Sequence, residues 1–385
     1  MHRVQSASAV LAVGIFAAAC KQKPPAPSVR ELSVPEVSRF VRSDVSDKKG
    51  WAADVRLALK AAGKPVDATH VCQVLAIVEQ ESGYEADPAV PGLGKVVKGE
   101  LDRMFAKLGP AASSARAALL DHTAPGTKQT FEQRLLDIRT EQDADLLYRE
   151  IVDFHRGRYP GMARAMDLLA PDLVEKTNPI TTAGSMQVSV GWALKYADAD
   201  DPALLRDALY TRAGGLKYGT ARLFIHDAPY DQPRYRFADF NAGVYASRNA
   251  ALQAQLTVVT GEKLATDGDF LLYDKDGDPR WKRSNSLNAL YAFRDAHAPE
   301  LSDGQVRRDA KKEKSAAFDQ TTTVRALRAA YTEKTGKKPE YAQVPNVALE
   351  SPKMKSGRST KWFADNVQRR YDDCLRRPGQ RRRKK

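Results

Sequence analysis

Two carboxylates close an otherwise apolar stretch of sequence, VCQVLAIVEQESGYEADPAV at residues 71–90. Valines and leucines recur three and four positions apart in it, which predicts a helix with a buried face. Glu79 and Glu81 come at its end, just before Ser82, and a helical wheel places the two acids on opposite flanks of the apolar stripe. A carboxyl beside apolar residues is poorly solvated when charged, so its pKa rises and it can act as a general acid. The competing interpretation is an ordinary helix end in water.

Two further segments bear on this choice: GSMQVSVGWA at residues 184–193 and RFADFNAGVYASRNAALQ at residues 236–253. In the first, Gly184 precedes Met186 and Gln187 ahead of a predicted amphipathic helix. In the second, Asn-Ala-Gly lies between two helical patterns. Alone, each segment is ordinary, since the first can occur by chance and Asn-Ala-Gly is a serviceable helix cap or turn. Their order along the chain is more informative.

Taken in order, Glu-Ser, Gly-x-Met-Gln and aromatic-Asn-Ala-Gly resemble the signature of the lysozyme-like lytic transglycosylases, which are muramidases that cleave peptidoglycan strands. The stretch GGLKYGTARLF at residues 214–224 is similar to the helix that usually precedes the third motif. The resemblance covers about residues 66–255. The overall pattern is also similar to a family of bacterial lipoproteins known mainly as an uncharacterised domain with a lysozyme-like core.

The resemblance implies roles for single residues. Glu81 stands at the position of the catalytic acid, which protonates the leaving oxygen of the MurNAc-GlcNAc β-1,4 bond, and Glu79 is the alternative acid. The expected substrate-binding residues are Ser82 near the acid, Gly184 where backbone approaches the sugar, Met186 and Gln187 in the cleft wall, Phe240 as a stacking surface, and Asn241, which is both structural and cleft-lining. The competing role for Ser82 is a helix cap. The resemblance implies no metal and no cofactor.

The chain departs from the family pattern in two ways. The first two motifs are separated by residues 82–183, far more than in the familiar soluble enzymes, so a largely helical insertion is expected at about residues 90–180. Phe240 stands where the family usually has a tyrosine before Asn-Ala-Gly. Any role of the missing hydroxyl passes to another group, such as Tyr235 or Tyr245, or is absent.

The sequence offers no second carboxylate with a clear role. Hydrolysis needs one at about 6.5–9.5 Å from the acid for inversion, or at about 5 Å for retention. Asp87 follows the predicted helix and Asp239 precedes Phe240, and their orientation is open. One carboxyl suffices if the sugar supplies its N-acetyl oxygen and its own 6-hydroxyl. The expected products therefore carry 1,6-anhydromuramoyl ends.

The N-terminus predicts export. MHRVQSASAVLAVGIFAAAC has a basic start and a short apolar run, which suits a signal peptide over residues 1–19 better than a permanent membrane span. Small residues before Cys20 resemble a bacterial lipobox, although Ala17 replaces the favoured leucine. The sequence thus predicts lipidation at Cys20 and a proline-rich, lipid-anchored tether over residues 20–50. Lys21, which is not aspartate, favours the outer membrane, with the protein facing the periplasm. The alternative is a plain signal peptide followed by an accidental cysteine.

The charge and the cysteine content of the chain limit the classes of binding partner that are expected. The formal net charge is +13, and residues 376–385 form a basic tail, RRPGQRRRKK, with seven basic residues. Such a tail is solvated or adheres to a polyanion, and because export excludes nucleic acid, the remaining partners are peptidoglycan strands and the membrane. Cys72 and Cys374 are left over after Cys20 and predict a disulfide in an oxidising compartment. The scattered histidines do not predict a metal site.

The expected fold class is mainly α, with a lysozyme-like core, a large helical insertion and a small β-hairpin. Helical patterns follow one another from Trp51 onward, whereas FLLYDKDGDPRWK at residues 270–282 predicts the hairpin around Asp-Gly. The resulting division is a catalytic domain over residues 51–300 and a helical C-terminal extension over residues 301–375, followed by the basic tail.

Three functions are compatible with the sequence. The first is a peptidoglycan lytic transglycosylase that uses Glu81 as both acid and base. The second is a non-catalytic peptidoglycan-binding lipoprotein, which the loss of the motif tyrosine favours and the intact Glu-Ser opposes. The third is a hydrolytic lysozyme of the same fold. A serine or cysteine amidase is disfavoured, because the chain has no Gly-x-Ser-x-Gly and Cys72 lies within the apolar helix.

Overall fold

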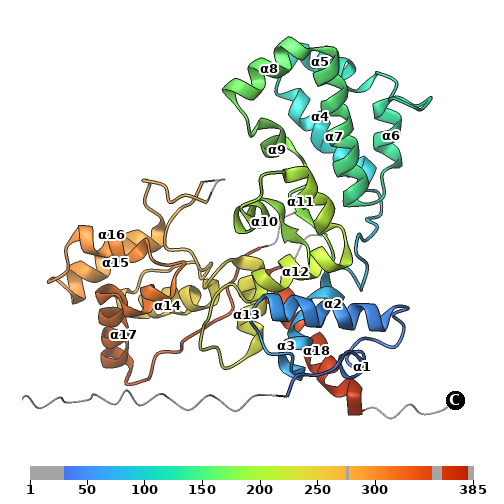
Figure 1. Ribbon diagram of the computed structural model, residues 1–385. Helices are drawn as coiled ribbons and strands as arrows, with labels where there is room; N and C mark the ends of the chain where they lie inside the picture. The colour runs from blue at the N-terminus through green and yellow to red at the C-terminus, as the bar shows by residue number, and fades with distance from the viewer. Residues whose placement is uncertain (1–29, 275–276, 349–357, 380–385) are drawn as a thin grey trace, which may run out of the picture.

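Helices dominate the molecule, as the sequence predicts. The computed structural model describes residues 30–274, 277–348 and 358–379, and within these ranges one two-stranded sheet accompanies the helices. Buried apolar side chains gather in three separate clusters. In Figure 1 these clusters occupy the lower centre, the top and the left side of the molecule. No helix in the described ranges has the length and apolar character needed to cross a membrane.

The central cluster draws on the beginning, the middle and the end of the chain. Its elements are α1 (Val34–Val37), α2 (Lys48–Ala61), α3 (Ala68–Glu81), β1 (Thr182–Ala183), β2 (Val188–Ser189), α10 (Val190–Ala197), α11 (Pro202–Leu209), α12 (Arg212–Leu223), α13 (Pro233–Ala242) and α18 (Thr360–Arg376). The two strands pair antiparallel, with Thr182 opposite Ser189.

Helix α3 lies inside the central cluster and carries Glu81 as its last residue. It begins after Asp67, whose side chain accepts a hydrogen bond from the backbone N–H of His70 at 2.8 Å and so satisfies one of the free donors of the first turn. Every residue from 71 to 78 is buried, because α2, α12 and α18 all pack against the helix. The predicted single apolar stripe is therefore wrong: the helix is covered on all sides, and this fixes the position of its last residue.

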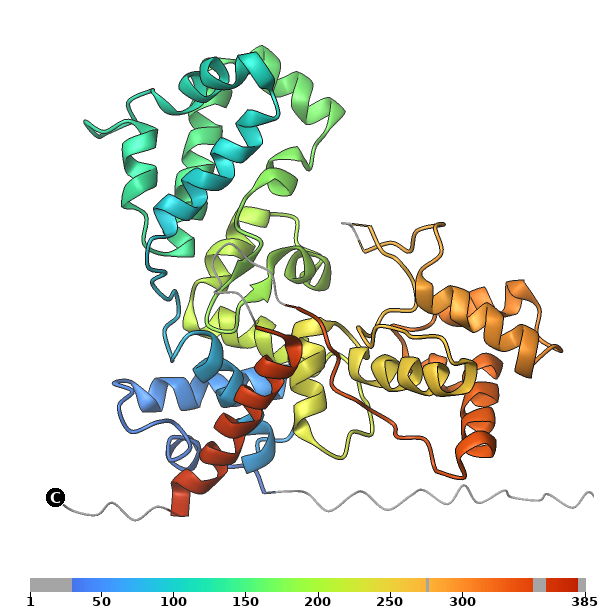
Figure 2. The ribbon, with the colours of Figure 1, turned by 180° about the vertical axis from the view of Figure 1, so that it is seen from behind.

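Helix α18 closes the core from the C-terminal end of the chain. Figure 2 shows it running across the central helices, although it is encoded last. The predicted disulfide is present: Cys374 in α18 is bonded to Cys72 in α3, with 5.6 Å between their Cα atoms. The last helix of the expected C-terminal extension, residues 301–375, thus belongs to the core. The reason is its apolar face, whose residues Phe363 and Val367 are buried in the central cluster.

Both ends of the described chain are more firmly packed than the sequence predicts. The expected tether at residues 20–50 becomes structured from residue 30, and Val37 and Val41 are buried in the central cluster. At the other end, a short 3₁₀ helix η3 (Arg377–Gly379) follows α18. The guanidinium of Arg377 donates to Oε2 of Glu79 at 2.7 Å, so the expected basic tail begins beyond this partly buried pair. Residues 1–29 and 380–385, which include Cys20 and most of the tail, lie outside the described residues.

The segment between the first two motifs forms its own helical cluster at the top of Figure 1. Its helices are α4 (Leu93–Ala106), the 3₁₀ helix η1 (Gly109–Ala111), α5 (Ala112–Leu120), α6 (Phe131–Asp137), α7 (Glu141–Arg158), α8 (Pro160–Leu169) and α9 (Leu173–Thr177). We refer to residues 88–180 as the insertion.

A buried polar group joins the insertion to the core. Nη1 of Arg206, in α11, donates to Oδ1 of Asp145 in α7 at 3.0 Å, and Nδ2 of Asn178 donates to the same oxygen at 2.6 Å. Nε of Arg206 also donates to Glu175 at 3.0 Å. Because loss of one partner would leave a buried charge uncompensated, these contacts hold the insertion in a fixed orientation on the core.

The third cluster lies between residues 246 and 335. It consists of α14 (Ala246–Thr260), α15 (Asn285–His297), α16 (Asp303–Ala310), the 3₁₀ helix η2 (Ala316–Gln320) and α17 (Thr322–Thr335). The expected domain boundary at residue 300 falls within it, because apolar residues on both sides of that position pack together.

The predicted hairpin is reduced to one bridge. Tyr273 pairs with Pro279, and the backbone N–H of Arg280 donates to Leu272 at 2.7 Å. No strand is assigned to the described part of residues 270–282, because proline lacks the N–H that would continue the ladder. The paired strands lie instead at β1 and β2, on either side of the second motif.

Candidate functional site

A sharp turn follows Glu81. Oγ of Ser82 donates to the backbone oxygen of Val78 at 3.0 Å, so Ser82 ends the helix and is not among the cleft-lining residues. This is the cap role and corrects its assignment as a substrate-binding residue. Gly83 and Tyr84 then adopt positive φ angles of 61° and 75°, a conformation that costs energy for tyrosine. The ring of Tyr84 is buried and meets Trp51 edge-on at 5.4 Å, which holds the turn in place.

A cleft of about 790 Å³ opens beside the end of α3, between the core and the insertion. It brings together four of the predicted site residues, Glu81, Gln187, Phe240 and Asn241. The insertion contributes much of the remaining wall, together with β1, β2 and α18. The other lining residues are Pro88, Ala89, Val90, Pro91, Val96, Val97, Glu100, Glu141, Pro179, Ile180, Thr181, Thr182, Val188, Ser189, Arg222 and Phe363. Its size is in the range of small-molecule binding sites.

Burial tunes the acid at the end of α3. The pKa of Glu81 is raised to about 7, mainly because burial removes solvent from the carboxyl and also because of the nearby negative charge of Glu141, whereas Arg370 and Arg358 oppose the change. A carboxyl with this pKa is about half protonated near pH 7 and can donate a proton. Glu79 does not line the cleft, because it is paired with Arg377 on another side of the helix. The geometry therefore favours Glu81 over the alternative acid.

The second motif forms the turn between β1 and β2. Gly184 has a φ of +79°, and a Cβ at this position would lie 2.2 Å from the backbone oxygen of Leu209. Glycine is required here for close approach to α11, not to the sugar. Met186 is fully buried and packs against Gly219 of α12. Neither residue lines the cleft, so their expected contacts with substrate are wrong.

Gln187 does line the cleft, but its amide is occupied by protein. Its Oε1 accepts a hydrogen bond from Oγ1 of Thr182 at 3.0 Å. Its Nε2 donates to Oε2 of Glu141 at 3.0 Å and to the backbone oxygen of Gly184 at 3.3 Å. Any hydrogen bond from Gln187 to a saccharide N-acetyl group would compete with these contacts. In this structure, Gln187 binds Glu141, another residue that lines the cleft.

The third motif is fixed from below by a buried network around Asp239. One of its oxygens accepts from the phenol of Tyr230 at 2.6 Å and contacts Nε2 of His226 at 2.9 Å, and the other accepts from the backbone N–H of Ser247 at 2.6 Å. Asp239 is 1% exposed and does not line the cleft, which removes it as a second acid. Its network leaves the neighbouring Phe240 in the cleft wall.

The other residues of the third motif take different positions. Oδ1 of Asn241 accepts a hydrogen bond from Oγ1 of Thr360 at 3.2 Å, so Asn241 both lines the cleft and fastens the start of α18. Tyr245 is buried and donates to the backbone oxygen of Asp227 at 2.9 Å. Neither Tyr235 nor Tyr245 is among the lining residues described above. Neither can replace the hydroxyl that is missing at Phe240.

Glu141 is the residue that the sequence interpretation missed. It is the first residue of α7, 3% exposed, and it lines the same cleft as Glu81. Thr140 and Asp143 form a capping box around it, a pattern that predicts a helix start but no catalytic role. Only the folded position of the insertion brings it to the cleft. Asp87, the other second-acid candidate, accepts at 3.4 Å from the backbone N–H of Gln142 and does not line the cleft.

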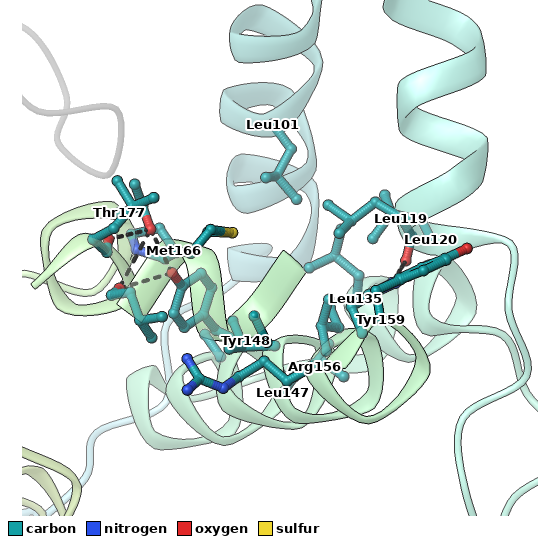
Figure 3. A pocket seen from close by; sticks show the side chains of 18 of the residues that line it. Leu101, Leu119, Leu120, Leu135, Leu147, Tyr148, Arg156, Tyr159, Met166 and Thr177 are labelled. Carbon is teal, nitrogen blue, oxygen red and sulfur yellow. Dashed lines mark hydrogen bonds between the residues drawn. The ribbon is translucent and has the colours of Figure 1, made fainter. Parts of the chain in front are cut away.

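A second cavity, of about 310 Å³, lies within the insertion and differs in character. Figure 3 shows leucine side chains from α4, α5, α6 and α7 around it, with Tyr148 and Thr177 joined at one end by a hydrogen bond of 2.6 Å. It contains none of the predicted site residues and no carboxylate. Cys72 is likewise unavailable for nucleophilic chemistry because it is in the disulfide. The cleft at Glu81 is thus the candidate site.

The pKa of Glu81 has a measurable consequence for stability. A carboxyl whose pKa is raised by folding, here from 4.5 to about 7, contributes stability below the lower value and loses it as the pH rises through the higher one. The free energy of unfolding of Glu81→Gln should therefore exceed that of the native protein by about 1–3 kcal/mol at about pH 8. At about pH 4 the two values should be equal. Denaturant unfolding at both pH values measures this difference. Glu85→Gln, at an exposed site, is the matched control, and an equal difference at both pH values would contradict the assignment.

Comparisons with known proteins give a family but no activity. Residues 44–377 match the family described as "Protein of unknown function (DUF1615)". The chain is also 32% identical over 384 residues to the uncharacterized protein YaiW of Escherichia coli (strain K12), covering 98% of this chain and 100% of that protein. No solved structure matches the chain. Since the match spans nearly all of the sequence, the chain belongs to the DUF1615 family.

Proposed function

We propose that this protein is a peptidoglycan lytic transglycosylase with a lysozyme-like core, which cleaves the MurNAc-GlcNAc β-1,4 bond. One observation supports this function best: Glu81, with a pKa of about 7, shares a cleft with Gln187, Phe240 and Asn241. These residues come from three motifs that lie far apart in the sequence and resemble the muramidase signature. A cleft with an apolar wall, an aromatic ring and a protonated carboxyl has the chemistry that glycoside cleavage requires.

In the proposed reaction, Glu81 acts twice. Its proton passes to the glycosidic oxygen as the bond from that oxygen to the anomeric carbon breaks. The N-acetyl oxygen of the substrate stabilises the anomeric carbon, and the carboxylate of Glu81 then takes the proton of the sugar's 6-hydroxyl, whose oxygen closes on that carbon. A pKa near neutral pH suits both steps, because the same group must lose and regain a proton. This scheme uses no metal and no cofactor.

The products distinguish this reaction from hydrolysis. Digestion of purified sacculi is expected to release mainly muropeptides with 1,6-anhydromuramoyl ends, each lighter by one water than its reducing-end counterpart. Mass spectrometry of the released material measures the ratio of the two forms. Dominant reducing-end products would show that water, and not the 6-hydroxyl, attacks the anomeric carbon.

A hydrolytic lysozyme is the second candidate, and Glu141 favours it. Hydrolysis requires a second carboxylate near the acid, and the insertion supplies one to the cleft. The non-catalytic alternative predicts a different result: the protein would co-sediment with sacculi without releasing soluble fragments. Analysis of both the pellet and the supernatant therefore separates all three functions.

We also propose that the protein is an outer-membrane lipoprotein that faces the periplasm and contacts peptidoglycan from its lipid anchor. Radiolabelled palmitate is expected to enter the protein, and Cys20→Ser should abolish the label. Lys21→Asp is the matched control, because it should keep the label while moving the protein to the inner membrane. Native protein that carries no acyl group would contradict the anchor.

A further inference from the structure

Two carboxylates from different parts of the chain meet in one cleft. Glu81 ends a core helix, whereas Glu141 begins α7 of the insertion, and both line the same cavity. The catalytic motifs account for the first and leave the second without a role. Since buried carboxylates almost always have specific partners, the contacts of Glu141 indicate what it does.

Glu141 is held by the second motif. Nε2 of Gln187 donates to Oε2 of Glu141 at 3.0 Å, and Thr182 in turn donates to Oε1 of Gln187 at 3.0 Å, which fixes the orientation of the amide. Gln187 has a φ of +50°, an uncommon conformation for a residue other than glycine. The turn between β1 and β2 thus presents the glutamine side chain to the insertion.

We propose that Glu141 is the second carboxylate of the cleft, delivered by the insertion and held by Gln187, and that it acts on the reaction as a positioning residue through Glu81. This inference rests on the proposed function and assigns the insertion a part in the site. The core alone then holds an incomplete cleft. The muramidase motif glutamine binds protein here, in place of the sugar contact that the resemblance implies.

Two features of the structure hold Glu141 in place. It lies at the N-terminus of the 18-residue helix α7, where the helix dipole stabilises an anion, and it accepts the amide hydrogen bond of Gln187. The charge of Glu141 raises the pKa of Glu81, with which it shares the cleft. Glu81 therefore keeps its proton to higher pH, which is the state that a general acid requires.

Other charged groups act on Glu81 from the neighbouring elements. Arg370 of α18 and Arg358, just before α18, favour its ionised form. Arg222 of α12 and Glu100 of α4 also line the cleft. If the charge of Glu141 is removed, the two arginines still lower the pKa of Glu81, and the charge that raised this pKa is gone. The predicted direction of change is a lower pKa for Glu81.

The test is the pH dependence of the full-length protein and its Glu141→Gln variant. For sacculus digestion, the alkaline limb of the profile should move to lower pH by about half a unit or more. Glu150→Gln is the matched control, because Glu150 belongs to the same helix, pairs with Arg134 and lies outside the cleft. Its alkaline limb should match that of the native protein.

A second readout does not need activity. Carbon-13 NMR of glutamate-labelled protein follows the titration of Glu81, with its signal assigned by comparison with Glu81→Gln. The midpoint should fall in Glu141→Gln and stay in place in Glu150→Gln. Gln187→Asn, whose amide is too short to keep both contacts, should shift the midpoint in the same direction and serves if Glu141→Gln does not fold.

The two readouts separate the possible failures. A midpoint that is unchanged in both Glu141→Gln and Gln187→Asn would overturn the role of Glu141, even if the protein digests sacculi. A midpoint that falls in a protein without any activity on sacculi would support the coupling and refute the proposed function. A loss of activity at all pH values, with an unchanged midpoint, would make Glu141 a structural residue.

Discussion

Glu81→Gln is expected to lower the digestion of sacculi by about a hundredfold to ten-thousandfold, the usual contribution of general acid–base catalysis. Glutamine keeps the shape of the side chain at the end of α3 but has no proton to donate to the leaving oxygen. The variant should fold normally, because Glu81 is partly exposed to the cleft and the residues of α3 that fill the core are unchanged. Release of soluble muropeptides measures the activity, and circular dichroism checks the fold.

Glu79→Gln is the matched control for this experiment. It makes the same chemical change two residues earlier in the same helix, outside the cleft, where Glu79 is paired with Arg377. It should keep its activity and lose some stability. If Glu79→Gln is inactive and Glu81→Gln digests sacculi at the native rate, the catalytic acid has been assigned to the wrong residue.

Removal of the Cys72–Cys374 disulfide is expected to have the largest effect on stability. The bond closes a loop with a sequence separation of 302 residues, and the chain-entropy model assigns such a loop about 6 kcal/mol, which strain in the native state can reduce. The double variant Cys72→Ala/Cys374→Ala should lower the free energy of unfolding by about this amount. Denaturant unfolding in oxidising and reducing buffer measures the difference.

Reductant provides the internal control for the disulfide. It should destabilise the native protein and leave the double variant unchanged, because the variant has no bond between α3 and α18 to lose. Mass spectrometry of denatured, alkylated protein counts the free thiols directly. Two free thiols at Cys72 and Cys374 in protein purified without reductant would exclude the bond.

Local patterns predicted the helical class and the helix that carries Glu81, because both depend on residues close together in sequence. The same patterns could not show what covers each helix. The stripe Val71, Val74, Leu75 and Val78 predicts one buried face, whereas Gln73 on another face is also buried. The cover of α3 includes α18, encoded about 300 residues later, and helical periodicity contains no information on such distant partners.

The sequence motifs correctly predicted some of the residues that line the cleft, namely Glu81, Phe240 and Asn241. The prediction was wrong where the backbone conformation determines whether a residue reaches the cleft. Gly184 and Met186 belong to a tight turn, and both are packed against α11 and α12 instead of facing the cleft. Glu141 has the sequence pattern of an ordinary helix start, so only the docking of the insertion could reveal it.

The pairing of α3 with α18 also sets a timetable for the growing chain. At a synthesis rate of about 5–20 residues per second, a separation of 302 residues means that Cys374 is made about 15–60 s after Cys72. Until then one flank of α3 lacks its cover, and Glu79 lacks the arginine that neutralises it. The core is therefore completed only when the last helix is made. A chain cut short during synthesis would carry every motif residue of the cleft and still lack the helix that closes its core.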